Sequence, residues 1–131
     1  MKAFLDTNVL VYAYSQDERA PRARALLKSG GLVAIQSLSE FSAVALGKMK
    51  MPWADLKLAL ALIEKLCMIA EPLDLQAHSR GLDLAERHRL PIFDAMLIAV
   101  AMANECRVFY SEDLQDGRTL EDRLTIRNPF A

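Results

Sequence analysis

The alternation of short apolar segments with longer segments of helical periodicity is the feature that most constrains the fold of this chain. Apolar runs that suit strands occur at 2–5, 32–35, 68–69, 108–110 and 124–126. Helical patterns begin at about Asn8 and occupy 19–29, 38–48, 53–67, 75–88 and 94–105. Strands that alternate with helices predict an α/β/α sandwich around a parallel sheet.

Length and composition suit one globular domain. The 131 residues are 53% hydrophobic and 25% charged, so residues 1–131 are predicted to form a single domain with a substantial core. The net charge of −1 argues against binding nucleic acid by overall charge alone, but it permits a basic face around an acidic pocket. Two isolated cysteines, no signal-peptide pattern and no apolar run that could span a bilayer predict a cytoplasmic protein.

Four acidic residues stand beside apolar segments, near the ends of predicted elements. Asp6 follows the first strand and Glu40 lies early in the helix after the second. Asp94 opens an apolar helix, and Asp113 follows the strand at 108–110. Because parallel strands end at one edge of a sheet, these acids can converge there. Clustered carboxylates repel one another and are ligands of hard cations, so the pattern predicts a Mg²⁺ or Mn²⁺ site.

Each acid also has an ordinary structural interpretation. Asp6 could cap the helix that follows it, and Glu40 could interact favourably with a helix dipole. Asp94 could be a helix cap, with Phe93 in a hydrophobic staple. Asp113 could be a loop acid. It is their common placement at one edge of the sheet that favours a functional site.

Segments around these acids also carry a family resemblance. They are FLDTNVLVYA at 4–13, SEF at 39–41, FDAMLIAVA at 93–101, YSEDLQDG at 110–117 and the closing LTIRNPF. In this order they resemble the PIN domain family, and within it the VapC-type toxin ribonucleases of prokaryotic toxin–antitoxin pairs. Ser39 departs from the Asn that many relatives have before the Glu, and we expect metal binding to survive this change.

The resemblance implies a fold, an activity and partners. The family fold is a parallel sheet of four or five strands between helices. The implied activity is that of a Mg²⁺- or Mn²⁺-dependent endoribonuclease acting on RNA, with a small antitoxin that blocks the acidic cleft and a homodimeric assembly. The family's acids fall on Asp6, Glu40, Asp94 and Asp113, and its small polar residue before the last acid falls on Ser111.

Polar side chains beside the acids are candidates for a supporting role. We expect Thr7, Asn8 and Ser111 to orient a carboxylate, a water or a phosphate by hydrogen bonds. Thr7 and Asn8 directly follow Asp6, which makes them candidates to support its carboxylate in particular.

The position of the fourth acid is open among three neighbouring residues. Strand alternation places Asp113 on the same side as Ser111, which favours Asp113. Asp116 lies beside Gly117 in a predicted turn, and it could still reach a cation through a water. Glu112 is interpreted as a solvated loop acid.

Two other functions fit parts of the pattern. A phosphatase or phospho-receiver would use Asp6 as acceptor, but it would need a paired acid near the start and a Lys after a late strand, and neither is evident. A PIN-like binding domain without activity is the other alternative. The apolar stripe of 53–67 is predicted to begin with Trp53, although Trp53 could instead serve a partner surface with Met49 and Met51. Leu58 and Leu62 fall off this stripe and could face a partner.

Overall fold

The computed structural model describes residues 2–131, in which strands and helices alternate as the sequence predicts. The strands of these residues are β1 (Ala3–Leu5), β2 (Leu32–Val33), β3 (Met68–Ile69), β4 (Val108–Tyr110), β5 (Thr119–Leu120) and β6 (Leu124–Arg127). Their helices are α1 (Thr7–Ala13), α2 (Ala20–Lys28), α3 (Ile35–Gly47), α4 (Trp53–Leu66), α5 (Leu75–His88) and α6 (Ile92–Ala103).

The strands form one sheet in the order β3-β2-β1-β4-β6-β5. The pairs from β3 to β6 are all parallel, and only the edge strand β5 runs antiparallel to its neighbour β6. The predicted α/β sandwich with a parallel sheet is therefore confirmed. The short strand β5 is an addition that the sequence pattern did not predict.

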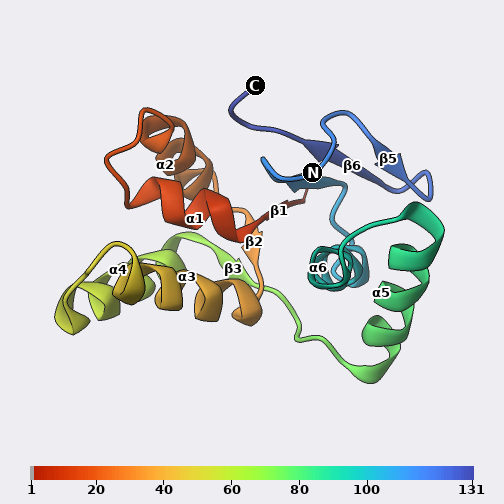
Figure 1. Cartoon of the computed structure of the whole chain (residues 1–131), viewed down its shortest axis with the longest axis horizontal. Helices are drawn as coiled ribbons and strands as arrows, with labels where there is room; N and C mark the ends of the chain where they lie inside the picture. Colours follow the sequence, from red (N-terminus) through yellow and green to blue (C-terminus); the bar gives the residue numbers. More distant parts are fainter. Residues whose placement is uncertain (1) are drawn as a thin grey trace.

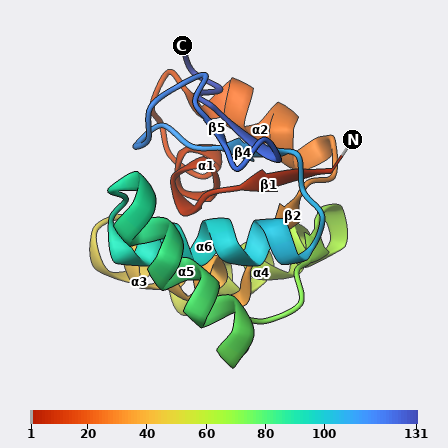
Figure 2. The ribbon, with the colours of Figure 1, turned by 90° about the vertical axis from the view of Figure 1, so that its right-hand side faces the viewer.

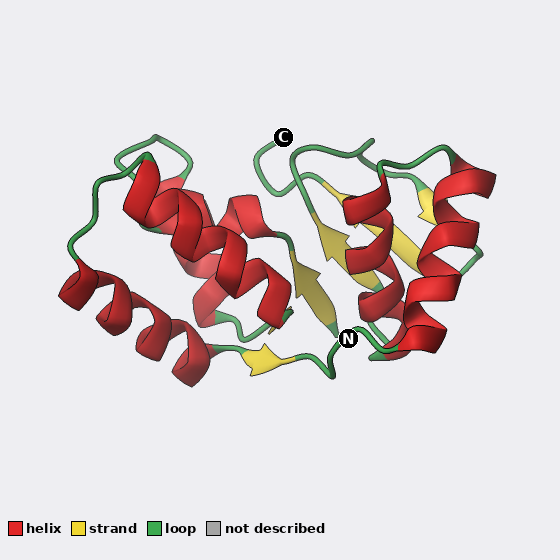
Figure 3. Ribbon diagram, turned by 60° about the horizontal axis from the view of Figure 1, so that its bottom comes forward, coloured by secondary structure: helices red, strands yellow, loops and turns green. Residues whose placement is uncertain are grey.

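Helices cover both faces of the sheet. Figure 1 shows α1–α4 on one side of the strands and α5 and α6 on the other, and Figure 3 shows the strands between these two groups. In the view of Figure 2, α6 and α5 lie below β1. Successive residues of β1 point to opposite faces of the sheet. Phe4 packs in the core beside α5 and α6, whereas Leu5 packs in the core beside α1–α4.

Two helices begin earlier than the sequence predicts, and both changes affect the site. α3 begins at Ile35 instead of residue 38, which places Glu40 in its second turn. α6 begins directly after Pro91, whose fixed φ suits the residue before a helix, so Asp94 lies inside the first turn. The prediction that Asp94 could be the cap residue is therefore wrong.

The apolar stripe of α4 is buried from its second turn onward. Leu56, Ala59 and Ile63 are buried, whereas Trp53 is 66% exposed and lies outside the core, which leaves open its alternative place on a partner surface. Leu58 and Leu62 are exposed, as their position off the stripe indicates. Among the helices of residues 2–131, none has the length and apolar character that a membrane span needs.

Candidate active site

Asp6 lies between β1 and α1 as the N-terminal cap of α1, and it is only 4% exposed. Its carboxylate accepts one hydrogen bond of 2.7 Å from the backbone N–H of Thr7 and another of 2.7 Å from the hydroxyl of Ser111. The second contact follows from the sheet register, since Leu5 lies opposite Tyr110 and the next residues of the two strands then face each other. Asp6 is thus both a helix cap and a buried acid.

The pKa of the buried Asp6 carboxyl is higher than that of an ordinary aspartate. Burial raises the pKa of Asp6 to about 6, while the hydrogen bonds from Ser111 and Thr7 oppose this rise. The negative charges of Asp94 and Asp113 raise the same pKa further. Residues far apart in the sequence therefore share one electrostatic environment.

Glu40 enters this environment from α3. Its carboxylate accepts hydrogen bonds from the hydroxyl of Thr7 at 2.7 Å and from the side-chain amide of Gln36 at 3.1 Å. Because Glu40 lies in the second turn of α3, its interpretation as a first-turn acid near the helix dipole is wrong. Gln36 was missed by the sequence analysis, although its spacing of four residues from Glu40 is typical of paired side chains on a helix.

Asp94 enters from the first turn of α6, on the opposite face of the sheet from α3. Burial raises the pKa of Asp94, and the negative charges of Asp113 and Glu40 raise it further. Its neighbour Phe93 is 73% exposed, so the suggested hydrophobic staple does not form. Asp94 therefore faces the other acids from a position that helix capping does not explain.

Asp113 follows β4 and is exposed. Its carboxylate accepts a hydrogen bond of 3.0 Å from the side-chain amide of Asn8, and its backbone N–H donates to the hydroxyl of Ser111 at 3.2 Å. The carboxylate of Asp116 instead accepts a hydrogen bond from the backbone N–H of Asn128 at 2.9 Å. Of these two loop acids, Asp113 is the one whose charge acts on Asp6 and Asp94.

The polar residues after Asp6 support different acids from the one expected. Thr7 donates its hydroxyl to Glu40, and Asn8 donates its amide to Asp113, while Asp6 itself is supported by Ser111. The α1 turn carries both side chains away from Asp6. Their expected role as the main support of the Asp6 carboxylate is therefore wrong, apart from the backbone N–H of Thr7.

Glu112 is not a solvated loop acid. Its carboxylate accepts a hydrogen bond of 2.6 Å from the hydroxyl of Tyr12 and forms an ion pair of 2.9 Å with Arg19. This contact joins residues that are 100 positions apart in the sequence, and no local pattern indicates it.

The chemistry of this cluster fits a hard divalent cation. It offers carboxylate oxygens that disfavour one another's ionisation, and Oδ1 of Asn8 is a buried acceptor with no donor among residues 2–131. As the side chains now lie, no three acidic, histidine or cysteine residues of the described chain stand close enough together to hold one ion. The fit therefore rests on the kind of donors and their shared environment.

Comparison with known proteins places the chain in a recognisable group. A family model described as "PIN domain" matches residues 3–116. No curated protein matches the chain. A toxin–antitoxin complex from Klebsiella pneumoniae is similar in structure, with a TM-score of 0.73, 17% identity and 98% of each chain covered.

Two further solved structures are similar. VapC20 of Mycobacterium tuberculosis, described as a sarcin–ricin loop cleaving toxin, has a TM-score of 0.68 at 18% identity and covers 86% of this chain and 90% of its own. VapBC2 of Rickettsia felis, bound to a DNA fragment from its promoter, has a TM-score of 0.67 at 18% identity and covers 98% of both chains. At these identities the likeness concerns the fold.

Proposed function

The chain belongs to the PIN domain family, and from this premise we propose that it is a metal-dependent endoribonuclease acting as the toxin of a toxin–antitoxin pair. The observation that carries the proposal is the shared electrostatic environment of four acids from separate elements. They are Asp6, Glu40, Asp94 and Asp113. The similar structures support it, since one is described as a sarcin–ricin loop cleaving toxin and another as a toxin–antitoxin complex.

Each part of the cluster has a role in hydrolysing a phosphodiester. The four carboxylates would hold Mg²⁺ or Mn²⁺, which when bound supplies positive charge that polarises a phosphoryl oxygen and favours ionisation of a water. Ser111 and Thr7 fix the rotamers of Asp6 and Glu40 by donating hydrogen bonds to them. Asn8 does the same for Asp113. These bonds would hold three of the four carboxylates before RNA arrives, and the side chains would still have to close around the cation.

The experiment that tests this function is RNA cleavage by the purified full chain. With Mg²⁺ or Mn²⁺ the wild type should cut RNA, and EDTA should stop it. Asp6→Asn and Asp94→Asn should each lower the rate by at least about 100-fold, because each removes a charge that holds the cation. Asp55→Asn is the matched control, since Asp55 is an exposed acid in the first turn of α4.

Two outcomes would count against the proposal. Equal cleavage by wild type and Asp94→Asn, with contaminating nuclease excluded, would remove the carboxylates from the mechanism. A wild type that folds and binds Mn²⁺ but cuts no RNA would favour the alternative of a silent binding domain.

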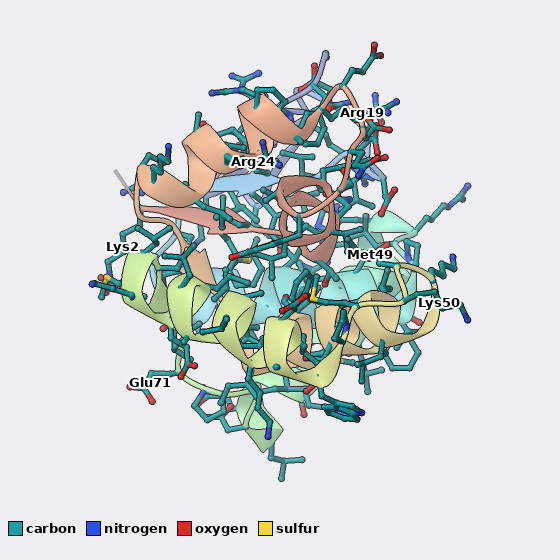
Figure 4. The ribbon with its side chains drawn as sticks, turned by 90° about the vertical axis from the view of Figure 1, so that its left-hand side faces the viewer. Lys2, Arg19, Arg24, Met49, Lys50 and Glu71 are labelled. Atoms are coloured by element: carbon teal, nitrogen blue, oxygen red, sulfur yellow. The ribbon has the colours of Figure 1, made fainter. Side chains whose placement is uncertain are left out.

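The partner part of the proposal has a surface to support it. A groove between α1, α2 and α4 is lined by apolar residues and two cations, namely Ala13, Tyr14, Arg24, Leu27, Lys28, Leu62 and Leu66. Figure 4 views the molecule from this side, with Arg24 on α2. Such a lining suits an antitoxin segment that carries apolar and acidic side chains. None of the four acids lines this groove, so a different segment of the antitoxin would block the acidic cleft.

A homodimer is also part of the proposal. Leu58 is 71% exposed and Trp53 is 66% exposed, so α4 presents apolar area that a second copy of the chain could cover. Light scattering of the purified chain checks this. A mass of two chains that falls to one chain in Leu58→Asp supports the dimer, whereas a monomeric wild type contradicts it.

Residues 1–131 are proposed to form a single domain. Both cores pack on opposite faces of the same sheet, and this arrangement over residues 2–131 supports the proposal.

A further inference from the structure

Three consecutive residues after β4 each form a hydrogen bond with a residue of the segment 6–12, which contains Asp6 and most of α1. The pairs are Ser111 with Asp6, Glu112 with Tyr12, and Asp113 with Asn8. The first and third pairs include proposed metal ligands. The middle pair includes none, so the proposed reaction leaves Glu112 and Tyr12 without a role.

Glu112 is held from two sides. One carboxylate oxygen accepts from the hydroxyl of Tyr12 at 2.6 Å, and the other pairs with Nε of Arg19 at 2.9 Å. Arg19 is itself fixed, because it contacts both carboxylate oxygens of Asp17 at 3.0 Å and lies 5.1 Å from the centre of the Tyr12 ring. We call Tyr12, Arg19 and Glu112 the Glu112 clamp. Figure 4 labels Arg19 beside the start of α2.

The clamp is a poor device for overall stability. The side chain of Arg19 is 37% exposed and that of Glu112 is 24% exposed, and exposed ion pairs add little to the free energy of folding. Its position is more informative than its strength. Asp113, the adjacent residue, is exposed, and within residues 2–131 its recorded hydrogen bonds are those with the amide of Asn8 and from its own N–H to Ser111.

We infer that the Glu112 clamp is a positioning device for Asp113. By tying Glu112 to Tyr12 and Arg19, it fixes segment 111–113 against α1, where Ser111 is bonded to Asp6 and the Asp113 carboxylate to Asn8. Tyr12 and Glu112 touch neither cation nor RNA in this role. They act through Asp113, and the inference rests on the proposed function of the four acids.

The sharpest test compares two neighbouring tyrosines. Tyr12→Phe removes the hydroxyl that reaches Glu112, whereas Tyr14→Phe removes a hydroxyl that donates to the backbone carbonyl of Ala59 at 3.3 Å. Titrating Mn²⁺ into the full chain, we expect Tyr12→Phe to weaken binding by about 3- to 10-fold, below the loss seen for direct partners of metal ligands. Tyr14→Phe should leave the Mn²⁺ dissociation constant within about 2-fold.

A double-mutant cycle shows whether Tyr12 acts through Asp113. If it does, Tyr12→Phe should cause no further loss of Mn²⁺ affinity in a chain that already carries Asp113→Asn. A full additional loss in that background would mean that Tyr12 acts by another route and would overturn the inference.

A second pair of variants tests the ion pair. Glu112→Gln keeps an acceptor for Tyr12 but loses the charge that holds Arg19, so Mn²⁺ affinity should fall by about 2- to 5-fold. Glu121→Gln is the control. Glu121 also pairs with an arginine, Arg87, but it follows the edge strand β5, which is separated from β1 and Asp6 by two strands of the sheet. Equal effects of the two substitutions would contradict a role specific to Glu112.

Hydrogen exchange separates failure of the clamp from failure of the proposed function. In metal-free protein, the backbone amides of 111–114 should exchange faster in Tyr12→Phe than in Tyr14→Phe. A chain that cuts no RNA and binds no Mn²⁺ would defeat the proposed function, and the exchange rates would still decide the clamp. Identical exchange in the two variants would overturn the inference even in an active nuclease.

Discussion

At the scale of single residues, the end of β1 places an ionisable group where water hardly reaches. Asp6 is 4% exposed. The structure records two hydrogen-bond donors to its carboxylate, namely the hydroxyl of Ser111 and the backbone N–H of Thr7. Two donors do not compensate for the lost hydration of a full negative charge. This explains why its pKa is raised in a protein without a cation, and why a cation would lower it again.

Metal-free protein should lose stability as the pH rises through the ionisation of Asp6. The unfolded pKa is near 3.8 and the folded pKa is about 6, so the folded state keeps a proton that the unfolded state has lost in between. This contribution is present at low pH and disappears as the pH passes 6, a change of roughly 3 kcal/mol. Between pH 5 and pH 7.5 the wild type should therefore lose about 1.4 kcal/mol of this contribution, because the rest is already lost below pH 5. Denaturant unfolding at these two pH values measures the loss against Asp6→Asn.

The Asn variant is its own control in this experiment. Asp6→Asn should be less sensitive to pH over the same interval, and adding Mn²⁺ at pH 7.5 should stabilise the wild type more than the variant. A wild type and an Asp6→Asn variant with parallel pH profiles would contradict the assignment of the shift to Asp6.

The sequence indicated which residues are candidates for the site better than it indicated which residues they contact. The acids at strand ends are visible because polar residues interrupt apolar runs, as Asp6 does. The contacts of Thr7 and Glu112 depend on how α1 turns and on which side chains lie across the sheet edge. Such long-range pairs leave no periodic signal in a single sequence.

At the scale of elements, the position of Asp94 depends on how closely α5 packs against α6. Gly81 of α5 makes the approach possible, because a Cβ at this position would lie 2.6 Å from the sulfur of Met96 and 3.3 Å from its Cα. A glycine in the middle of a helix is ordinarily unfavourable. Here it allows the helix that carries Asp94 to lie against its neighbour.

Two glycines in helices should respond oppositely to alanine. Gly81→Ala should destabilise the chain by about 1–2 kcal/mol, because the contact with Met96 outweighs the gain in helix propensity. Gly47→Ala is the matched control, since a Cβ there meets nothing within 4 Å, and it should be stabilising by about 0.5 kcal/mol. Denaturant midpoints measure both, and a stabilised Gly81→Ala would show that the two helices have room to spare.

Element boundaries and edge strands were the least predictable features. β5 has two residues and pairs with β6 through a turn whose central residues, Glu121 and Asp122, both have positive φ. Turns of this kind are ordinarily signalled by Asn-Gly or Asp-Gly, which are absent here. The strands that pack in the core, such as β1 and β4, have strong apolar patterns and were predicted at their observed positions.

At the scale of the whole molecule, charge is divided between the site and the remaining surface. Seventeen acidic residues less the four of the site leave thirteen against sixteen basic residues, so the rest of the chain carries a small positive excess. A polyanion such as RNA would meet this excess around the acidic cluster. Sequence analysis predicted the fold at this scale from alternation alone, whereas its proposed partners came from family resemblance.

The central claim is that four carboxylates from separate elements form one cation site, and anomalous diffraction from crystals containing Mn²⁺ tests it most directly. We predict an anomalous peak at the carboxyl edge of the sheet, within about 2.5 Å of carboxylate oxygens of Asp6 and Asp94. Asp113 should lie closer to it than Asp116, and Asp94→Asn should abolish it. No peak at this edge at saturating Mn²⁺, in a chain that still cuts RNA, would contradict the account.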